Sequence, residues 1–477
     1  MAGNIKKNTV LNMIKVVSQI IFPLITFPYI SRVLHAERMG EVNYANSIYS
    51  YIALIASLSI TNYAVRECST VKDDKKELGQ VASQLFSINM WSTLIAYTVM
   101  IVICCIPRFQ NVSTLIVVYC VNLIFTTLGA DWINIAVEDF KFITIRTVAF
   151  QAISLVLMFL FVHGPEDYLS YVIINVIASS GANILNLAYR RKYCKVSFLL
   201  HPDARKHLPP ILKFFAAVIT QQIYVNSDII MLGLMKGNRD VGLYSSASKI
   251  FEIANLMIAS IFTVALSQAC KTYAEADFEK YNKVLREAVL FLIEIGVPCV
   301  VGMILIPKNI ISLVSGAEYT GAALSLMIFG FALFFSFFHG FFGNLLAIPM
   351  GDFNIGIIAA LVSSIANIVL NIFLIPKFGY NAAAFTTMLA ELVSAIILGR
   401  KINKNVKIKN VSKAIFHTCI GCAAFSAFLI FMKKTEMQSV VQTLIMVLGS
   451  IVIYGIVMLI TKDEFAISNI RMIKMRK

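Results

Sequence analysis

Residues 221–252 read Gln221-Gln-Ile-Tyr-Val-Asn-Ser-Asp228, then an apolar run, a polar turn at 237–240, and Val241-Gly-Leu-Tyr-Ser-Ser-Ala-Ser-Lys-Ile-Phe-Glu252. The turn joins two long apolar segments, which predicts two consecutive membrane-spanning helices. Asp228 and Lys249 then lie at one depth, roughly 12 Å from the turn at about 1.5 Å per helical residue. A charge near the bilayer centre costs about 2.5–3.5 kcal/mol, so we expect this acid and base to pair, to line a wet cavity, or both.

The composition extends this prediction to the whole chain. Of its 477 residues, 58% are hydrophobic and 14% are charged, whereas soluble domains are about 25% charged. A membrane-spanning helix needs about 20 apolar residues. We therefore predict an all-α polytopic membrane protein with fourteen spans, near 9–34, 41–65, 79–106, 112–133, 147–163, 168–189, 210–236, 242–270, 284–306, 321–348, 355–375, 380–400, 412–432 and 439–461.

The basic residues predict the orientation of these spans. With the N-terminus inside, the inner segments carry 30 Lys and Arg and the outer loops carry 9. Such an excess is typical of cytoplasmic loops, so we expect both termini to be cytoplasmic. The net charge of +15 is then explained by topology, and we expect no nucleic-acid partner.

The domain organisation follows from the longest inner segment, 190–209, which separates six spans from eight. We predict an N-terminal six-helix bundle at 1–195, a C-terminal six-helix bundle at 196–409, and two additional helices with a cytoplasmic tail at 410–477. A faint repeat aligns 38–47 with 238–247. It indicates a pseudo-two-fold relation between the bundles, as in transporters built from parallel repeats.

Motifs of enzymes are missing from the sequence. It contains no Gly-x-x-x-x-Gly-Lys-Ser/Thr, His-Glu-x-x-His or Gly-x-Ser-x-Gly motif, which are typical of nucleotide hydrolysis, metalloprotease and esterase chemistry. The longest outer loop is about 307–320. We therefore predict that the chain is not an enzyme and uses no cofactor or metal. The short outer loops also argue against a membrane glycosyltransferase or polymerase.

Four polar residues in or near the spans are candidates for binding a substrate. Lys15 lies about two turns into the first span, where it either reaches back to the inner interface or serves as a cavity cation. Arg66 ends the second span, as a topology anchor or a lumen residue. Asp228 and Lys249 either form a purely structural ion pair or line the cavity, and Glu252 is close enough in sequence to share Lys249.

Two further acids are candidates for coupling transport to an ion. Glu391 lies eleven residues into the twelfth span, without an obvious partner, and Glu294 lies ten residues into the ninth. An acid at such a depth is protonated or titrates with a cation. The alternative is a satisfied core residue. We also expect Pro298 to bend the ninth span.

Several motifs resemble those of bacterial Wzx-type oligosaccharide flippases. They are Phe27-Pro-Tyr-Ile-Ser-Arg-Val-Leu34, Asn43-Tyr-Ala-Asn-Ser47, Tyr63-Ala-Val-Arg-Glu67, Asp131-Trp-Ile-Asn-Ile-Ala-Val-Glu138 with Arg146 downstream, and Val241-Gly-Leu-Tyr244 with Lys249. The resemblance covers most of the chain and is best over 10–275. Its superfamily includes multidrug and toxin extrusion antiporters and the lipid II flippase.

The resemblance implies two six-helix bundles that flip undecaprenyl-diphosphate-linked oligosaccharides across the bacterial cytoplasmic membrane by alternating access. The product would feed capsule, O-antigen or a similar polymer. Lys15, Arg66 and Lys249 would meet the diphosphate, with Asp228 beside Lys249. Expected partners are the lipid-linked oligosaccharide, membrane lipids, H⁺ or Na⁺, and a polysaccharide polymerase with its assembly proteins. The alternative is an ion-coupled multidrug antiporter of the same superfamily, although a lumen for organic cations would favour acids over Lys249.

Overall fold

A computed structural model describes residues 2–400, 406, 408–409, 411–434 and 440–463, and within these ranges every regular element is a helix. The α-helices are α1 (Ala2–Ser57), α2 (Ile60–Thr70), α3 (Lys75–Cys105), α4 (Gln110–Gly129), α5 (Trp132–Ala136), α6 (Phe140–Phe161), α7 (Tyr168–Tyr189), α8 (Ala204–Met235), α9 (Asn238–Ala274), α10 (Phe278–Phe291), α11 (Val297–Leu305), α12 (Pro307–Val314), α13 (Ala323–Gly340), α14 (Phe353–Phe378), α15 (Tyr380–Gly399), α16 (Ser412–Lys433) and α17 (Val440–Ile460). Short 3-10 or π-helical segments are η1 (Pro107–Phe109), η2 (Pro165–Asp167), η3 (Arg190–Lys192), η4 (Leu292–Gly296), η5 (Ala317–Ala322) and η6 (Phe341–Ala347). The predicted all-α class is confirmed.

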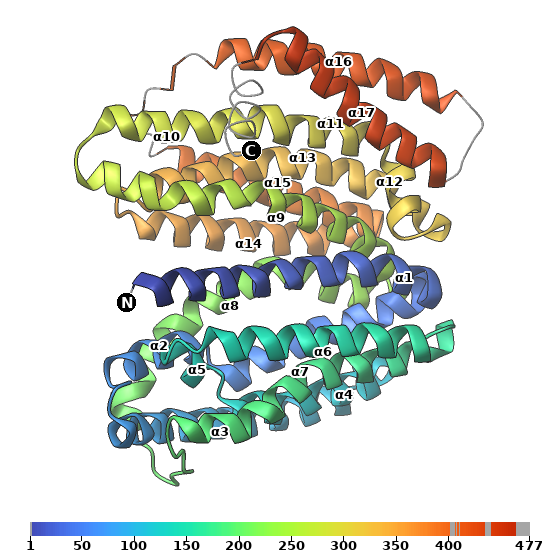
Figure 1. The fold of residues 1–477 in the computed structure, drawn as a ribbon. Helices are drawn as coiled ribbons and strands as arrows, with labels where there is room; N and C mark the ends of the chain where they lie inside the picture. Colours follow the sequence, from blue (N-terminus) through green and yellow to red (C-terminus); the bar gives the residue numbers. More distant parts are fainter. Residues whose placement is uncertain (1, 401–405, 407, 410, 435–439, 464–477) are drawn as a thin grey trace. The chain divides into compact units, whose positions relative to one another are not determined.

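The predicted number of spans is also confirmed. In the described part of the chain, thirteen helices are long and apolar enough to cross a membrane, and one of them, Ile21–Thr70, has 50 residues. A helix of that length measures about 75 Å, more than twice the roughly 30 Å of a bilayer core. At His35 the backbone leaves the helical conformation, with φ 61° and ψ 171°, and the chain turns back (Figure 1). This helix therefore supplies two spans and brings the total to fourteen.

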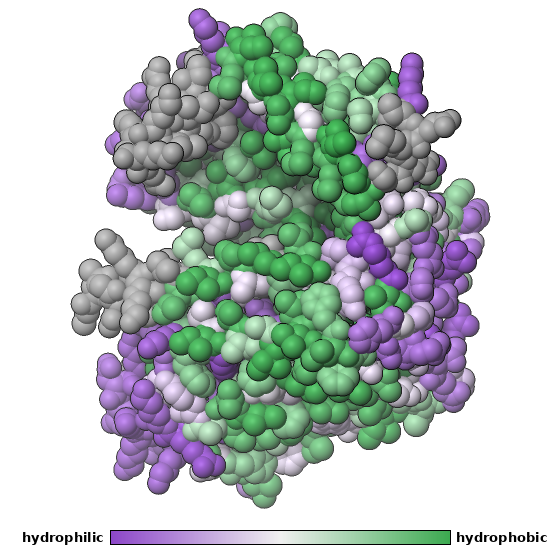
Figure 2. Space-filling view, turned by 45° about the vertical axis from the view of Figure 1, so that its right-hand side comes forward, coloured by the Kyte–Doolittle hydropathy of each residue, from purple (hydrophilic) through white to green (hydrophobic). Residues whose placement is uncertain are grey.

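The surface has the polarity expected of a membrane protein. Figure 2 shows apolar side chains over the middle of the helices, with hydrophilic side chains gathered toward the helix ends. Large side chains on the lipid-facing surface, such as Leu160, Val264 and Phe373, are well exposed. In water such exposure would be unfavourable, whereas lipid tails solvate it.

The second span is less regular than predicted. α1 ends at Ser57 and α2 begins at Ile60, because Leu58 and Ser59 have left-handed backbone conformations. The break leaves the end of the span, including Arg66, on a separate short helix.

The ninth span has an irregular backbone just before Pro298, whereas the predicted bend itself stays a prediction. Pro298 has no backbone N–H, which frees the carbonyl of the residue four positions earlier, Glu294. The helix widens there into the π-helical segment η4, and the Tyr454 hydroxyl of α17 donates to the Glu294 carbonyl at 2.8 Å. A side chain from one of the two additional helices thus satisfies a backbone group that would otherwise be unpaired in the membrane.

Four helices that begin at the predicted inner side share one type of N-terminal cap. Asp74, Asp139, Asp203 and Asp277 precede α3, α6, α8 and α10, and each carboxylate accepts a backbone N–H of the first turn. An Asp N-cap satisfies N–H groups that have no partner within the helix. Hydrogen bonds from the backbone N–H groups of Glu77 and Lys76 hold the pKa of Asp74 below its usual range.

The chain divides into two compact units, Met1–Gly242 and Leu243–Lys477. By its contacts, α8 thus groups with the first unit, although it follows the predicted boundary at 195–196. The predicted domain limits stay a prediction, and the predicted tail beyond residue 463 lies outside the described residues.

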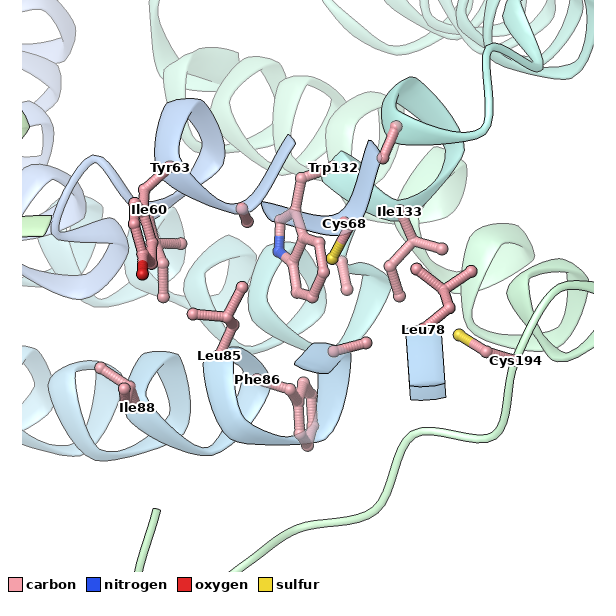
Figure 3. Packing of buried hydrophobic residues seen from close by; sticks show 14 of the residues in the cluster. Ile60, Tyr63, Cys68, Leu78, Leu85, Phe86, Ile88, Trp132, Ile133 and Cys194 are labelled. Atoms are coloured by element: carbon pink, nitrogen blue, oxygen red, sulfur yellow. The ribbon is translucent and has the colours of Figure 1, made fainter. Parts of the chain in front are cut away.

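Each unit has its own apolar packing. In the first, α2, α3 and α5 enclose a core that contains Leu78, Leu85 and Trp132 (Figure 3). In the second, α13, α14 and α15 pack together, and α16 lies along α17 (Figure 1).

Candidate functional site

A polar cavity of about 490 Å³ lies within the first unit, between α1, α2, α3, α4, α7 and α8. Its polar lining consists of hydroxyl, amide and carboxylate side chains: Tyr49, Ser50, Ser57, Thr61, Asn89, Thr126, Thr127, Asp131, Asn183 and Gln222. Among the described residues that line it, none is a Lys or Arg, and Asp131 is the one acid. Such a lining offers many neutral donors and acceptors.

Hydrogen bonds between helices hold this lining in place. The Asn89 amide donates to the Ala56 carbonyl at 2.7 Å, and the Asn183 amide donates to the Thr126 hydroxyl at 3.3 Å. The Tyr51 hydroxyl, on α1, donates to the Gln222 carbonyl of α8 at 3.3 Å. The cavity wall is therefore built from several helices rather than from a mobile loop.

Asp131 is held by a buried arginine. The Arg146 side chain is 3% exposed and donates to the Asp131 carboxylate, whose side chain is 40% exposed. Arg146 also donates to the Ala182 carbonyl at 2.8 Å and lies 5.5 Å from the Phe142 ring centre. Both members of the pair occur in the motifs quoted above, but the sequence analysis did not place them in a site. Their spacing of fifteen residues is no helical repeat, so only the fold brings them together.

The predicted cations of the first unit do not line this cavity. Arg66 lies on α2 with its side chain 73% exposed, and its Nε is 4.0 Å from the Glu67 carboxylate. Lys15 lies half-buried on α1. The position of Arg66 fits a topology anchor, and that of Lys15 fits a side chain that reaches back to the inner interface. A substrate role for either residue stays a prediction.

The predicted pair Asp228 and Lys249 divides between the two units. Asp228 is buried on α8 of the first unit. Lys249, on α9 of the second, donates to the Glu252 carboxylate at 3.0 Å, with side chains 36% and 50% exposed. Lys249 is therefore paired with its helical neighbour, which was one of the expected arrangements. Its interaction with Asp228 stays a prediction.

The expectation that Glu391 lacks a partner is wrong. Its carboxylate, 5% exposed on α15, lies 2.8 Å from Nδ1 of His339, which ends α13 and is 38% exposed. The sequence analysis missed this histidine because it lies 52 residues away and matches no motif. The pair joins a buried carboxylate to an imidazole, which can accept or donate a proton.

Glu294 lies beside a second cavity, of about 460 Å³, between α10, α16 and the end of α17. Its lining also includes Arg286, Lys413, His417 and Asp463, and His417 Nδ1 lies 3.0 Å from the Asp463 carboxylate. Glu294 is buried, and its Oε2 has no hydrogen-bond partner among the described residues. This acid therefore belongs to a mixed cluster of charges.

A buried amide network near Glu391 was also missed. Asn371 accepts from the Thr386 hydroxyl at 2.6 Å and donates to Asn367 at 3.1 Å, within α14 and α15. The four-residue spacing of the two asparagines places them on one helix face, which is the pattern that would have indicated the network. No group of three His, Cys, Asp or Glu side chains that could hold a metal occurs in the described ranges.

Together, the fold and the polar cavities define a polytopic membrane protein with the architecture of a transporter. Residues 5–267 match the model of the polysaccharide biosynthesis protein family, which is more than half of the chain. The chain belongs to this family. Residues 214–373 also match the MatE family model. The resemblance stated from the motifs is thereby confirmed.

Two curated relatives are similar over much of the chain. A capsular polysaccharide biosynthesis protein of Staphylococcus aureus, CapF, is 24% identical over 76% of this chain and 89% of its own length. A putative O-antigen transporter of Shigella dysenteriae is 21% identical over 66% of this chain and 79% of its own.

Two solved structures share the fold. The lipid II flippase MurJ, in an inward closed conformation, superimposes with a TM-score of 0.73 and 17% identity over 97% of this chain and all of that one. An inward-facing multidrug transporter of the MATE family superimposes with a TM-score of 0.60 and 13% identity over 87% of this chain and 96% of that one.

Proposed function

We propose that the chain flips oligosaccharide repeat units, linked to undecaprenyl diphosphate, from the inner to the outer leaflet of the bacterial cytoplasmic membrane. The repeat units would feed capsule, O-antigen or a similar surface polymer, with a polymerase and assembly proteins acting afterwards. Both termini would be cytoplasmic, as the basic residues predict. Transport by alternating access makes and breaks no covalent bond in the substrate.

The observation that carries this proposal is the cavity of the first unit. Its wall of hydroxyl and amide groups lies among membrane-spanning helices, where polar groups are unfavourable without a function. A sugar chain presents many hydroxyl groups and needs such partners to leave water. A near absence of net charge in the lining suits neutral sugars better than organic cations.

For the diphosphate we favour Lys249 as the first contact. Its side chain is half-exposed, and its partner Glu252 is more exposed still. In the water-filled cavity that we predict, an exposed ion pair is worth only about 0–1 kcal/mol, so an anionic substrate can displace the glutamate at little cost. Lys15, Arg66 and Asp228 stay in this proposal as further substrate residues, on the resemblance alone.

For ion coupling we favour Glu391 over Glu294. The Glu391 carboxylate lies 2.8 Å from Nδ1 of His339, a base that can take over a proton or be replaced by a cation. Glu294 lines a cavity together with both basic and acidic residues, Arg286, Lys413 and Asp463, so its charge is coupled to several others. Either H⁺ or Na⁺ suits a carboxylate ligand.

An ion-coupled multidrug antiporter is the second candidate, favoured by the match of residues 214–373 to the MatE family model. A drug pump should protect cells from organic cations and leave surface polymer unchanged. A flippase should do the reverse.

The experiment measures surface polymer in cells that lack the native gene and express variants of this chain. Lys249→Met should reduce polymer at least about tenfold per folded molecule, since one charge contact to phosphate is lost. Lys249→Arg should retain partial activity, because the charge remains while the geometry changes.

Lys271→Met is the matched control. Lys271 lies on the same helix and pairs with Glu275 at 3.9 Å. This variant should support normal polymer levels. Normal polymer levels with Lys249→Met would show that Lys249 does not bind the substrate. If the wild-type chain gave drug resistance but no polymer, the antiporter function would be favoured over the flippase function.

A further inference from the structure

A second cavity of the first unit, of about 650 Å³, is lined by five basic residues and, among the described residues, by no acid. It lies between the start of α3 and the segment that follows α7, both on the predicted inner side of the membrane. The basic residues are Lys75, Lys76, Arg191, Lys192 and Lys195. Like charges gathered around one cavity repel one another, and a bound anion relieves this repulsion.

The wall opposite α3 is a built structure. We call residues 193–203 the strap. Its backbone N–H groups at Ser197 and Leu199 donate to the hydroxyls of Ser83 and Ser87 at 3.0 and 2.8 Å. These two serines lie four residues apart on one face of α3, so they hold the strap parallel to the helix.

Two further contacts fix the start of the strap. Cys194 is buried in the apolar core beside Leu78 (Figure 3). At Gly79, a Cβ atom would lie 2.9 Å from the Lys195 carbonyl oxygen, so only glycine lets the strap approach α3 this closely. Lysines that only determine the membrane topology would not need a backbone held in place by contacts of this kind.

The surroundings of the cavity are apolar and exposed. Phe198 and Leu200 of the strap are half or more exposed, and the Phe198 ring lies 6.2 Å from that of Trp91 on α3, itself exposed. Exposed apolar side chains on and beside a membrane-spanning helix are solvated by lipid tails. A ligand here would thus meet cations at one end and apolar side chains at the other.

We propose that this cavity binds the phosphate of an anionic phospholipid in the cytoplasmic leaflet, with the acyl chains against Phe198, Leu200 and Trp91. Basic pockets on the cytoplasmic side of helical membrane proteins recognise such headgroups. Free phosphate would use the same cations, but it would gain nothing from the apolar neighbours. The lipid ties the strap, and with it the start of α3, to the inner leaflet.

The test uses the two tryptophans of the chain. Trp91 is exposed beside the cavity, whereas Trp132 is buried in the core, so Trp132→Phe leaves a single reporter. The purified full chain in neutral detergent is titrated with brominated phosphatidylglycerol or brominated phosphatidylcholine, whose bromine atoms quench nearby tryptophan. We expect phosphatidylglycerol to reach half-quenching at a concentration about tenfold lower or more, from three or more cation contacts.

Two variants remove equal charge in this background. Lys76→Gln, Arg191→Gln and Lys195→Gln together should abolish the preference for phosphatidylglycerol. Lys271→Gln, Lys280→Gln and Lys283→Gln, which are also at the predicted inner side, should preserve it. Three results would overturn the proposal. One is equal quenching by both lipids in the Trp132→Phe protein. The others are a preference for phosphatidylglycerol that survives the first triple variant, or one that is lost in the control triple variant.

Sodium phosphate is added at constant ionic strength to separate the two sources of the anion. We expect no displacement of the lipid at millimolar phosphate. Displacement there would assign the cavity to a free phosphate and refute the lipid. None of these readouts depends on transport, so failure of the proposed flippase function leaves this inference unaffected.

Discussion

The ion pairs Arg146–Asp131 and Lys249–Glu252 contain the same charges but differ in their surroundings. Arg146 is 3% exposed and has a carbonyl and an aromatic ring as additional neighbours, whereas the side chains of Lys249 and Glu252 are 36% and 50% exposed. Removing one partner of a buried pair strands a charge, whereas an exposed pair contributes little. The first pair therefore holds the fold, and the second leaves a cation available for a ligand.

The pair His339–Glu391 lies between these extremes. Glu391 is 5% exposed, which is close to the value for the structural residue Arg146. His339 is 38% exposed, which is close to the value for Lys249. The difference in exposure within one pair is suited to a group that takes up and releases an ion while staying in place.

The largest expected effect comes from breaking the buried pair. Arg146→Met should destabilise the protein by about 2–4 kcal/mol, because the Ala182 carbonyl loses its donor and the partly exposed Asp131 carboxylate loses a charged hydrogen bond. The measurement is the thermal unfolding midpoint in detergent. Arg146→Met with Asp131→Leu should recover part of the loss, and Arg66→Met, at an exposed arginine, should leave the midpoint near that of the wild type. A buried-pair variant as stable as this control would contradict the structural role.

An intermediate effect is expected for Glu391→Gln. The amide keeps a hydrogen bond to His339 but no charge, so we expect a stability loss of about 1–3 kcal/mol. Transport driven by an imposed H⁺ or Na⁺ gradient should fall, while transport without a gradient should change less. The control is Glu279→Gln, which removes an exposed acid. Equal transport under every gradient would reduce Glu391 to a core residue.

The smallest stability effect is expected for Lys249→Met. The loss should stay below about 1 kcal/mol, since the side chains of Lys249 and Glu252 are 36% and 50% exposed. The unfolding midpoint of this variant therefore separates it from Arg146→Met, even though each removes one cation. A loss comparable to that of Arg146→Met would make Lys249 structural and would explain its transport defect without substrate binding.

The sequence by itself determined the class, the fourteen spans and the position of the irregular backbone before Pro298. Transfer of a helix into lipid is close to a sum over its residues, so hydropathy and the distribution of Lys and Arg are readable locally. A missing N–H at proline is equally local. The motifs around Asp131, Tyr63 and Lys249 then indicated the family, which the match over residues 5–267 confirmed.

The tertiary structure alone decided which polar groups from different helices meet. Glu391 pairs with a histidine 52 residues away, Asp131 with an arginine fifteen residues on, and the freed carbonyl of Glu294 with a tyrosine 160 residues on. Such partners depend on the rotation and depth of each helix against its neighbours. Those quantities come from side-chain packing between helices, which hydropathy does not encode because lipid and a neighbouring helix are equally apolar.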